Sequence, residues 1–199
     1  MFSTTNLSDA VLQNWTIWLV AATLVVAAVI DGWMLKVPNW LTYPMVFSGW
    51  IYSWTAFGWT GLGFSVLATI VGLALLMPLY CVGGMGAGDV KLLAGVGAWV
   101  GTYGQPDTYW GGLMVMLYAF CATAIIGGGI AVLMVLWRRD WTKHHAQFLT
   151  ILAEFATVRD PNRLAAIAAG RKSSMLLLPY GIPIAIGTIL YFALSGMLI

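Results

Sequence analysis

Two aspartates interrupt long apolar runs in this sequence. Asp31 closes an apolar stretch shortly before Lys36, and Asp89 follows a glycine-rich segment shortly before Lys91. Ionisable groups inside apolar membrane segments are costly, and they usually serve a function. Two carboxylates that share one proton can act together, because one accepts a proton from water while the other polarises a carbonyl group. The chemistry that these residues suggest is hydrolysis by an activated water.

Composition assigns the chain to the membrane proteins. Of its 199 residues, 61% are hydrophobic and 8% are charged, whereas soluble domains carry about 25% charged residues. The formal net charge of +2 gives no sign of a nucleic-acid partner. Cys81 and Cys121 lie in apolar runs without CxxC spacing, so we expect small buried side chains rather than metal ligands. We expect an all-α, polytopic membrane protein that uses no metal or other cofactor.

Six apolar runs predict six transmembrane helices, since a span needs about 20 mainly apolar residues. The first run has no basic residue before it, unlike a signal peptide, so we expect it to remain as a membrane helix. Residues 1–199 are predicted to form a single transmembrane domain. The expected spans are Trp15 to about Leu35, about Trp40 to Phe57, about Leu62 to Cys81, Val90 to about Thr102, about Tyr109 to Trp137, and about Met175 to Leu198.

The basic residues predict the orientation, because short cytoplasmic loops are enriched in Lys and Arg. With six spans, all nine basic residues fall on one side of the membrane, and both termini lie on the non-cytoplasmic side. Asp31 and Asp89 are then expected at similar depth near the cytoplasmic edge. The nine residues are Lys36, Lys91, Arg138, Arg139, Lys143, Arg159, Arg163, Arg171 and Lys172.

The fourth run is short. From Val90 to Thr102 a helix rises only about 20 Å, less than the apolar layer of about 30 Å. We therefore expect the Asp89 end to be recessed below the cytoplasmic surface. The glycines before it, Gly83, Gly84, Gly86 and Gly88, favour a non-helical loop. Such a loop is tolerated at that depth only inside protein or beside water, which predicts a water-accessible pocket.

Residues 138–174 are predicted to form a cytoplasmic loop. Within it, Phe148, Ile151, Leu152 and Phe155 recur at helical spacing. This pattern predicts an amphipathic helix that lies on the membrane surface and contacts lipid.

Three segments resemble one known family. The segment Gly86 to Asp89 (GAGD) is similar to the GxGD element of the type IV prepilin peptidases, which are membrane aspartic proteases. The segment Lys36 to Thr42 (KVPNWLT) resembles the turn that follows the family's other aspartate. The segment Leu178 to Pro183 (LPYGIP) is similar to the start of the last helix in short members tied to tight-adherence (Flp) pilus assembly. Together the resemblances cover nearly the whole chain.

The resemblance implies a bacterial inner-membrane aspartic endopeptidase that cleaves the leader from a pilin-like precursor at the cytoplasmic boundary. Such a substrate has a short polar leader, is cut after glycine, and has an apolar N-terminal helix that docks between the enzyme's helices. Longer members carry an additional methyltransferase part with paired CxxC spacing, which nothing here matches, so a peptidase-only form is expected. The implied catalytic residues are Asp31 and Asp89, and the supporting motif residues are Gly86, Gly88, Lys91, Lys36, Pro38, Asn39 and Thr42.

Other interpretations stay open at this point. Asp31 and Asp89 could be helix-end carboxylates paired with Lys36 and Lys91. Asn39 is expected to cap the second helix, and the alternative is that Asn39 or Thr42 forms a hydrogen bond to an aspartate or to substrate. The chain could also be a proton- or cation-coupled transporter or channel, although no inverted repeat is evident. A non-catalytic scaffold for pilus assembly is the third alternative.

Overall fold

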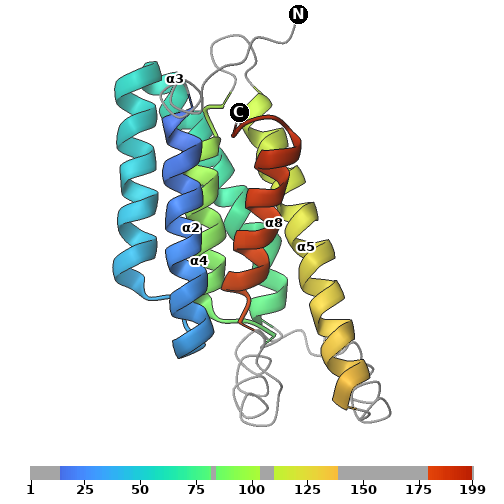
Figure 1. Ribbon diagram of the computed structural model, residues 1–199. Coiled ribbons are helices and arrows are strands. Elements are labelled where there is room, and N and C mark those ends of the chain that lie inside the picture. The colour runs from blue at the N-terminus through green and yellow to red at the C-terminus, as the bar shows by residue number, and fades with distance from the viewer. Residues whose placement is uncertain (1–13, 82–83, 104–109, 139–178, 199) are drawn as a thin grey trace, which may run out of the picture.

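The computed structural model describes residues 14–81, 84–103, 110–138 and 179–198. Within these ranges the chain is helical and contains no strand, which confirms the predicted all-α class. Most of the predicted loop at 138–174, with its interfacial helix, lies outside the described residues. The helices, shown in Figure 1, are α2 (Trp15–Met34), α3 (Asn39–Cys81), α4 (Ala87–Val100), α5 (Gly111–Arg138) and α8 (Gly181–Leu194).

Helix α3 consists of two arms. Gly58 has φ 65° and ψ −154°, which is not helical and which glycine adopts without a steric penalty. The chain reverses there, and Figure 1 shows one arm running back beside the other. The indole nitrogen of Trp50 joins the arms by donating to the hydroxyl of Thr69 at 3.0 Å. The five helices of the described ranges therefore make six helical segments, in the order of the six apolar runs.

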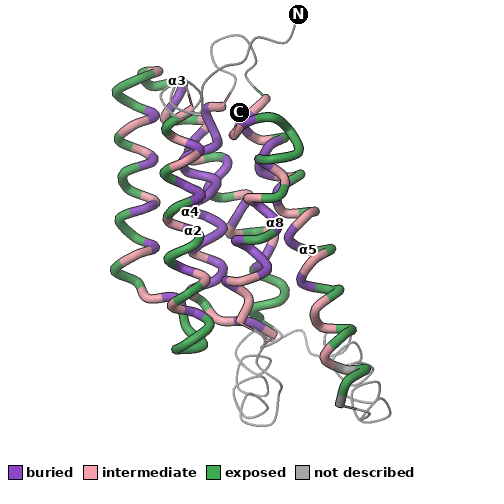
Figure 2. Tube along the Cα trace, in the orientation of Figure 1, coloured by how far each residue is buried: buried purple, intermediate pink, exposed green. Residues whose placement is uncertain are grey.

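Helix α4 lies in the middle of the bundle and is buried along most of its length (Figure 2). A helix that is apolar on all sides is stable only when it is surrounded by protein or lipid. Its 14 residues rise about 21 Å. The helix begins at Ala87, three residues before the expected start, so Asp89 lies inside its first turn.

Helices α3 and α4 approach each other through small residues. A Cβ added at Gly97 would collide with the carbonyl oxygen of Ala68 on α3. Nearby, the hydroxyl of Ser65 donates to the carbonyl oxygen of Ala98 at 2.5 Å. Small residues permit this close backbone contact. The hydrophobic effect does not drive helices together in lipid, so van der Waals packing of this kind stabilises the pair.

The outer surface of the bundle suits a membrane. The segments Trp15–Met34, Asn39–Cys81 and Gly111–Met134 are long and apolar enough to cross one, and α8 is apolar but shorter. Exposed tryptophans occur at both ends of the bundle, as expected for side chains at membrane–water interfaces. The chain is thus a membrane protein. These tryptophans are Trp33, Trp40 and Trp137 at one end, and Trp15, Trp59 and Trp110 at the other.

The two cysteines differ from expectation. Cys81 and Cys121 are free, and both are exposed rather than buried as we expected. An exposed position on a lipid-facing surface is still apolar, so a small apolar side chain is suited to it.

We predict that Gly97→Ala destabilises the fold by about 1–3 kcal/mol, because the added methyl group overpacks the contact between α3 and α4. The matched control is Gly63→Ala, since a Cβ at Gly63 meets no atom within 4 Å and alanine favours a helix. Unfolding in detergent, followed by tryptophan fluorescence, measures both variants. Equal stability of the two variants would contradict the packing interpretation.

Candidate active site

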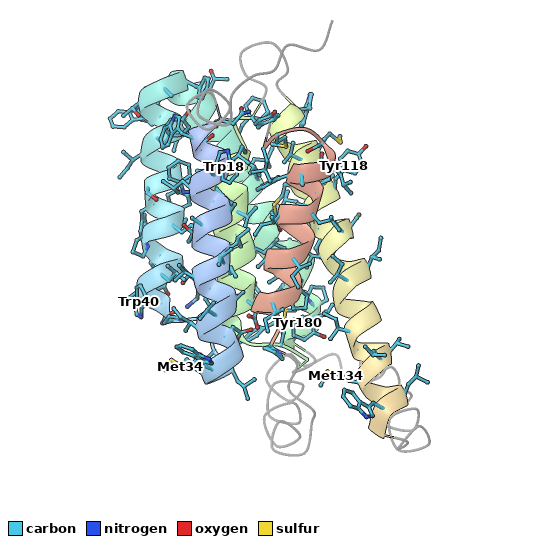
Figure 3. The ribbon with its side chains drawn as sticks, in the orientation of Figure 1. Trp18, Met34, Trp40, Tyr118, Met134 and Tyr180 are labelled. Carbon is cyan, nitrogen blue, oxygen red and sulfur yellow. The ribbon has the colours of Figure 1, made fainter. Side chains whose placement is uncertain are left out.

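Asp31 and Asp89 lie at the same end of the bundle. Asp31 is in the last turn of α2, and Asp89 is in the first turn of α4. Figure 3 shows Met34, Trp40 and Tyr180 at this end. Both carboxylates are buried, with 2% and 5% of the residue exposed, respectively. Because a buried carboxylate needs hydrogen-bond partners, the contacts of these two side chains define the site.

Asp31 is held by the start of α8. Its Oδ2 accepts a hydrogen bond from the backbone N–H of Gly181 at 2.7 Å. Gly181 is the first residue of α8, where backbone N–H groups lack an acceptor within the helix and attract negative charge. A Cβ on Gly181 would lie 2.9 Å from both Cβ and Oδ2 of Asp31. This approach therefore requires glycine.

Asp89 is held by its own motif. Its Oδ2 accepts a hydrogen bond from the backbone N–H of Gly86 at 3.1 Å. Gly86 is the N-cap of α4 and has an extended conformation. A carboxylate at the third helical position that binds the N-cap N–H is half of a capping box. The GAGD segment thus starts the helix and orients Asp89 at the same time.

The two aspartate motifs pack against each other. A Cβ on Gly88 would collide with the carbonyl oxygen of Val37, and Val37 is buried. Val37 belongs to the turn between α2 and α3, just after Asp31. The VPN turn and the GAGD segment, which are far apart in the sequence, therefore meet in the structure.

Tyr180 comes directly before the glycine that holds Asp31. It is the N-cap of α8 and is half-buried at the aspartate end of the bundle (Figure 3). Tyr180 and Gly181 were not among the expected site residues. The proline-flanked LPYGIP segment was the only signal for them in the sequence.

Lys91 and Asn39 form a separate polar contact. The ammonium group of Lys91 donates to Asn39 Oδ1 at 2.9 Å and to the hydroxyl of Tyr43 at 3.0 Å. Asn39 is the first residue of α3 rather than its cap, and its side chain binds Lys91 of α4. Pro38 lies before it in the turn and accepts from the backbone N–H of Thr42 at 3.3 Å. The buried Thr42 hydroxyl lies 3.5 Å from the carbonyl oxygen of Asn39.

Among the residues that the structure describes, Lys36 makes no side-chain contact of this kind. It is exposed and follows Leu35, the left-handed C-cap of α2. The partner that the structure gives to Asp31 is the backbone N–H of Gly181. The alternative that paired Asp31 with Lys36 finds no support in this geometry.

A family model described as the type IV leader peptidase family matches residues 18–137, which include both aspartates. This chain belongs to the type IV leader peptidase family. It is 32% identical over 117 residues to a prepilin leader peptidase/N-methyltransferase of Aeromonas salmonicida and to one of Aeromonas hydrophila. The match covers 55% of this chain and 38% of each relative, so it spans less than half the length of these curated relatives. No solved structure gives a significant match.

We predict a favourable coupling energy of about 0.5–1 kcal/mol between Lys91 and Asn39. The energy is small because water partly reaches their contact and weakens it. The double-mutant cycle uses Lys91→Met, Asn39→Ala and the combination, with unfolding in detergent as the measurement. The control cycle pairs Lys91→Met with Trp40→Phe, for which we expect additive effects. Additivity in the Lys91–Asn39 cycle would contradict a stabilising contact.

Proposed function

We propose that this chain is a membrane aspartic endopeptidase that removes the leader peptide from pilin-like precursors. The main support is that two buried aspartates lie at one end of the bundle, where the turn after Asp31 packs against the segment that carries Asp89. Membership of the type IV leader peptidase family agrees with this role. Two curated relatives are named prepilin leader peptidases, and the proposal extends that activity to this chain.

In the proposed mechanism, Asp31 and Asp89 share one proton, because two nearby carboxylates do not readily ionise together. The ionised member removes a proton from water, and the protonated member polarises the scissile carbonyl group. The resulting hydroxide adds to the carbonyl carbon, and the leaving nitrogen takes a proton from the carboxyl group that had removed it from water as the C–N bond breaks. The N–H groups of Gly181 and Gly86 each hold one carboxylate oxygen, which fixes the orientation of the pair.

The proposal includes a topology. The six helical segments each cross the bacterial inner membrane, with both termini on the non-cytoplasmic side and the aspartates facing the cytoplasm. Supporting observations are that Lys36 and Lys91 lie at the aspartate end and that α5 ends there at Arg138 (Figure 1). The short, buried α4 agrees with a site recessed below the lipid headgroups. In this orientation the leader approaches from the cytoplasm.

We expect Asp31→Asn and Asp89→Asn each to lower cleavage of a pilin-like precursor by about 10²–10⁴-fold, because an amide cannot take part in the shared-proton chemistry. Cleavage is measured with purified enzyme and precursor in detergent. The control is Met34→Asn, which introduces the same amide at an exposed position at the same end of α2. Full activity in either aspartate variant would rule out the proposed mechanism.

The variant Gly181→Ala tests whether the hydrogen bond from the Gly181 N–H to Asp31 is needed for activity. We expect kcat to fall about 10–100-fold, because displacement of the N–H donor removes a charge-assisted hydrogen bond of about 1.5–3 kcal/mol. KM should change little, since the carboxylate rather than the substrate loses a contact. The control is Gly128→Ala, where the added Cβ meets no atom within 4 Å. An unchanged kcat for Gly181→Ala would show that this contact is dispensable.

A further inference from the structure

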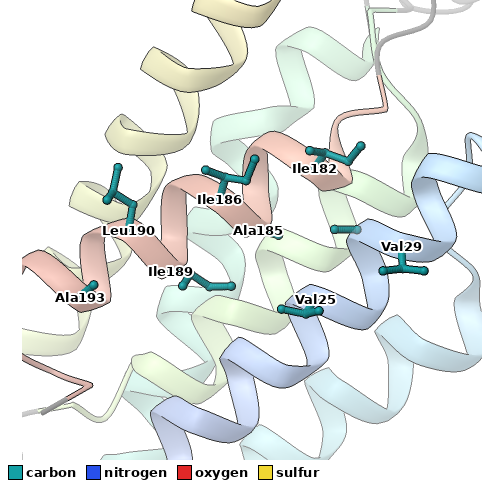
Figure 4. Close-up of a pocket in the computed structure, with 9 residues that line it drawn as sticks. Val25, Val29, Ile182, Ala185, Ile186, Ile189, Leu190 and Ala193 are labelled. Atoms are coloured by element: carbon teal, nitrogen blue, oxygen red, sulfur yellow. The ribbon is translucent and has the colours of Figure 1, made fainter.

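An apolar groove runs along the outside of the bundle between α2 and α8, with a volume of about 590 Å³. Its lining consists of Val, Ala, Ile and Leu side chains only, among them Val25, Val29, Ile182, Ile186 and Leu190 (Figure 4). We call this feature the α2–α8 groove. Because none of its lining side chains is polar, its occupant must be apolar and must satisfy its own backbone hydrogen bonds.

One end of the α2–α8 groove lies at the candidate active site. Ile182 directly follows Gly181, whose N–H binds Asp31. On the other side of the groove, Val29 lies two residues before Asp31 on α2. From Ile182 to Ala193, the last lining residue on α8, the groove extends about 16 Å. It thus covers about half of the apolar layer of a membrane and ends at Asp31.

We propose that the α2–α8 groove binds the apolar helix that follows the cleavage site of the substrate. This inference rests on the proposed function. A helix in the groove lies parallel to the spans of the enzyme, and its cytoplasmic end lies beside Asp31, where the scissile bond must be. Small side chains in the lining, such as Ala28 and Ala185, permit the close helix approach that drives association in lipid.

The groove also determines which residue of the substrate helix lies beside which residue of α2. Val25 lies six residues before Asp31 on α2, which is about 9 Å along the helix axis. A substrate helix that begins at Asp31 and follows the groove therefore brings its sixth residue, or one close to it, beside Val25. Lipid acyl chains are the alternative occupant of the groove, and they would impose no such register.

The first experiment compares Val25→Trp with Val26→Trp. The two valines are neighbours on α2 and similarly exposed, at 51% and 44%, but only Val25 lines the groove. We expect Val25→Trp to raise KM for a pilin-like precursor about tenfold, equivalent to about 1.4 kcal/mol of lost binding, with kcat little changed. Val26→Trp should behave as wild type. Equal KM values for the two variants would overturn the groove as the docking site.

The second experiment locates the helix by disulfide formation. The enzyme carries Val25→Cys or Val26→Cys in a Cys81→Ser/Cys121→Ser background, and the precursor carries one cysteine six residues after its cleavage site. With molecular oxygen and a copper catalyst as oxidant, two thiols lose two electrons and two protons to form the disulfide. We expect rapid cross-linking at position 25 and little at position 26.

Two failures are distinguishable in these experiments. If wild-type enzyme cleaves the precursor but cross-linking is absent, or is equal at positions 25 and 26, the groove holds lipid and the docking proposal is wrong. If wild-type enzyme does not cleave the precursor, the proposed peptidase function itself fails. Cross-linking that favours position 25, together with the selective rise in KM, supports both.

Discussion

The hydrogen bond between the Gly181 N–H and Asp31 Oδ2 is the constraint on which the site depends. A carboxylate in an apolar bundle is stable only if polar groups replace its water, and the start of α8 supplies such a group at 2.7 Å. This contact requires a residue without a side chain at position 181. Asp89 shows the same solution, since a backbone N–H at the start of its own helix holds it.

Several features were predictable because their causes are local. Asp31 and Asp89 stand out as charges in apolar runs, and the chain reversal at Gly58 falls between two such runs. The short fourth run also predicted a short helix. The start of α4 at Ala87 was missed, because the extended Gly86 that caps it has no side chain to mark a helix start.

Other features depend on contacts that no local pattern encodes. Asn39 was assigned to a cap from its place after proline, but Lys91, 52 residues later, takes its side chain instead. Gly181 lies 150 residues after Asp31, so its role could not be inferred from spacing. Cys121 was expected inside the protein. An apolar run does not distinguish a protein-facing side from a lipid-facing side, because both surroundings are apolar.

The contact between Asp31 on α2 and Gly181 on α8 can form only late in biosynthesis. The ribosome makes α2 first and α8 after all the other described helices, and helices enter the fold in that order as they emerge. Until α8 is inserted, Asp31 lacks its Gly181 donor. A partly synthesised chain therefore carries both carboxylates before the contact that holds Asp31 has formed, and this contact becomes available only when the last described helix enters the membrane.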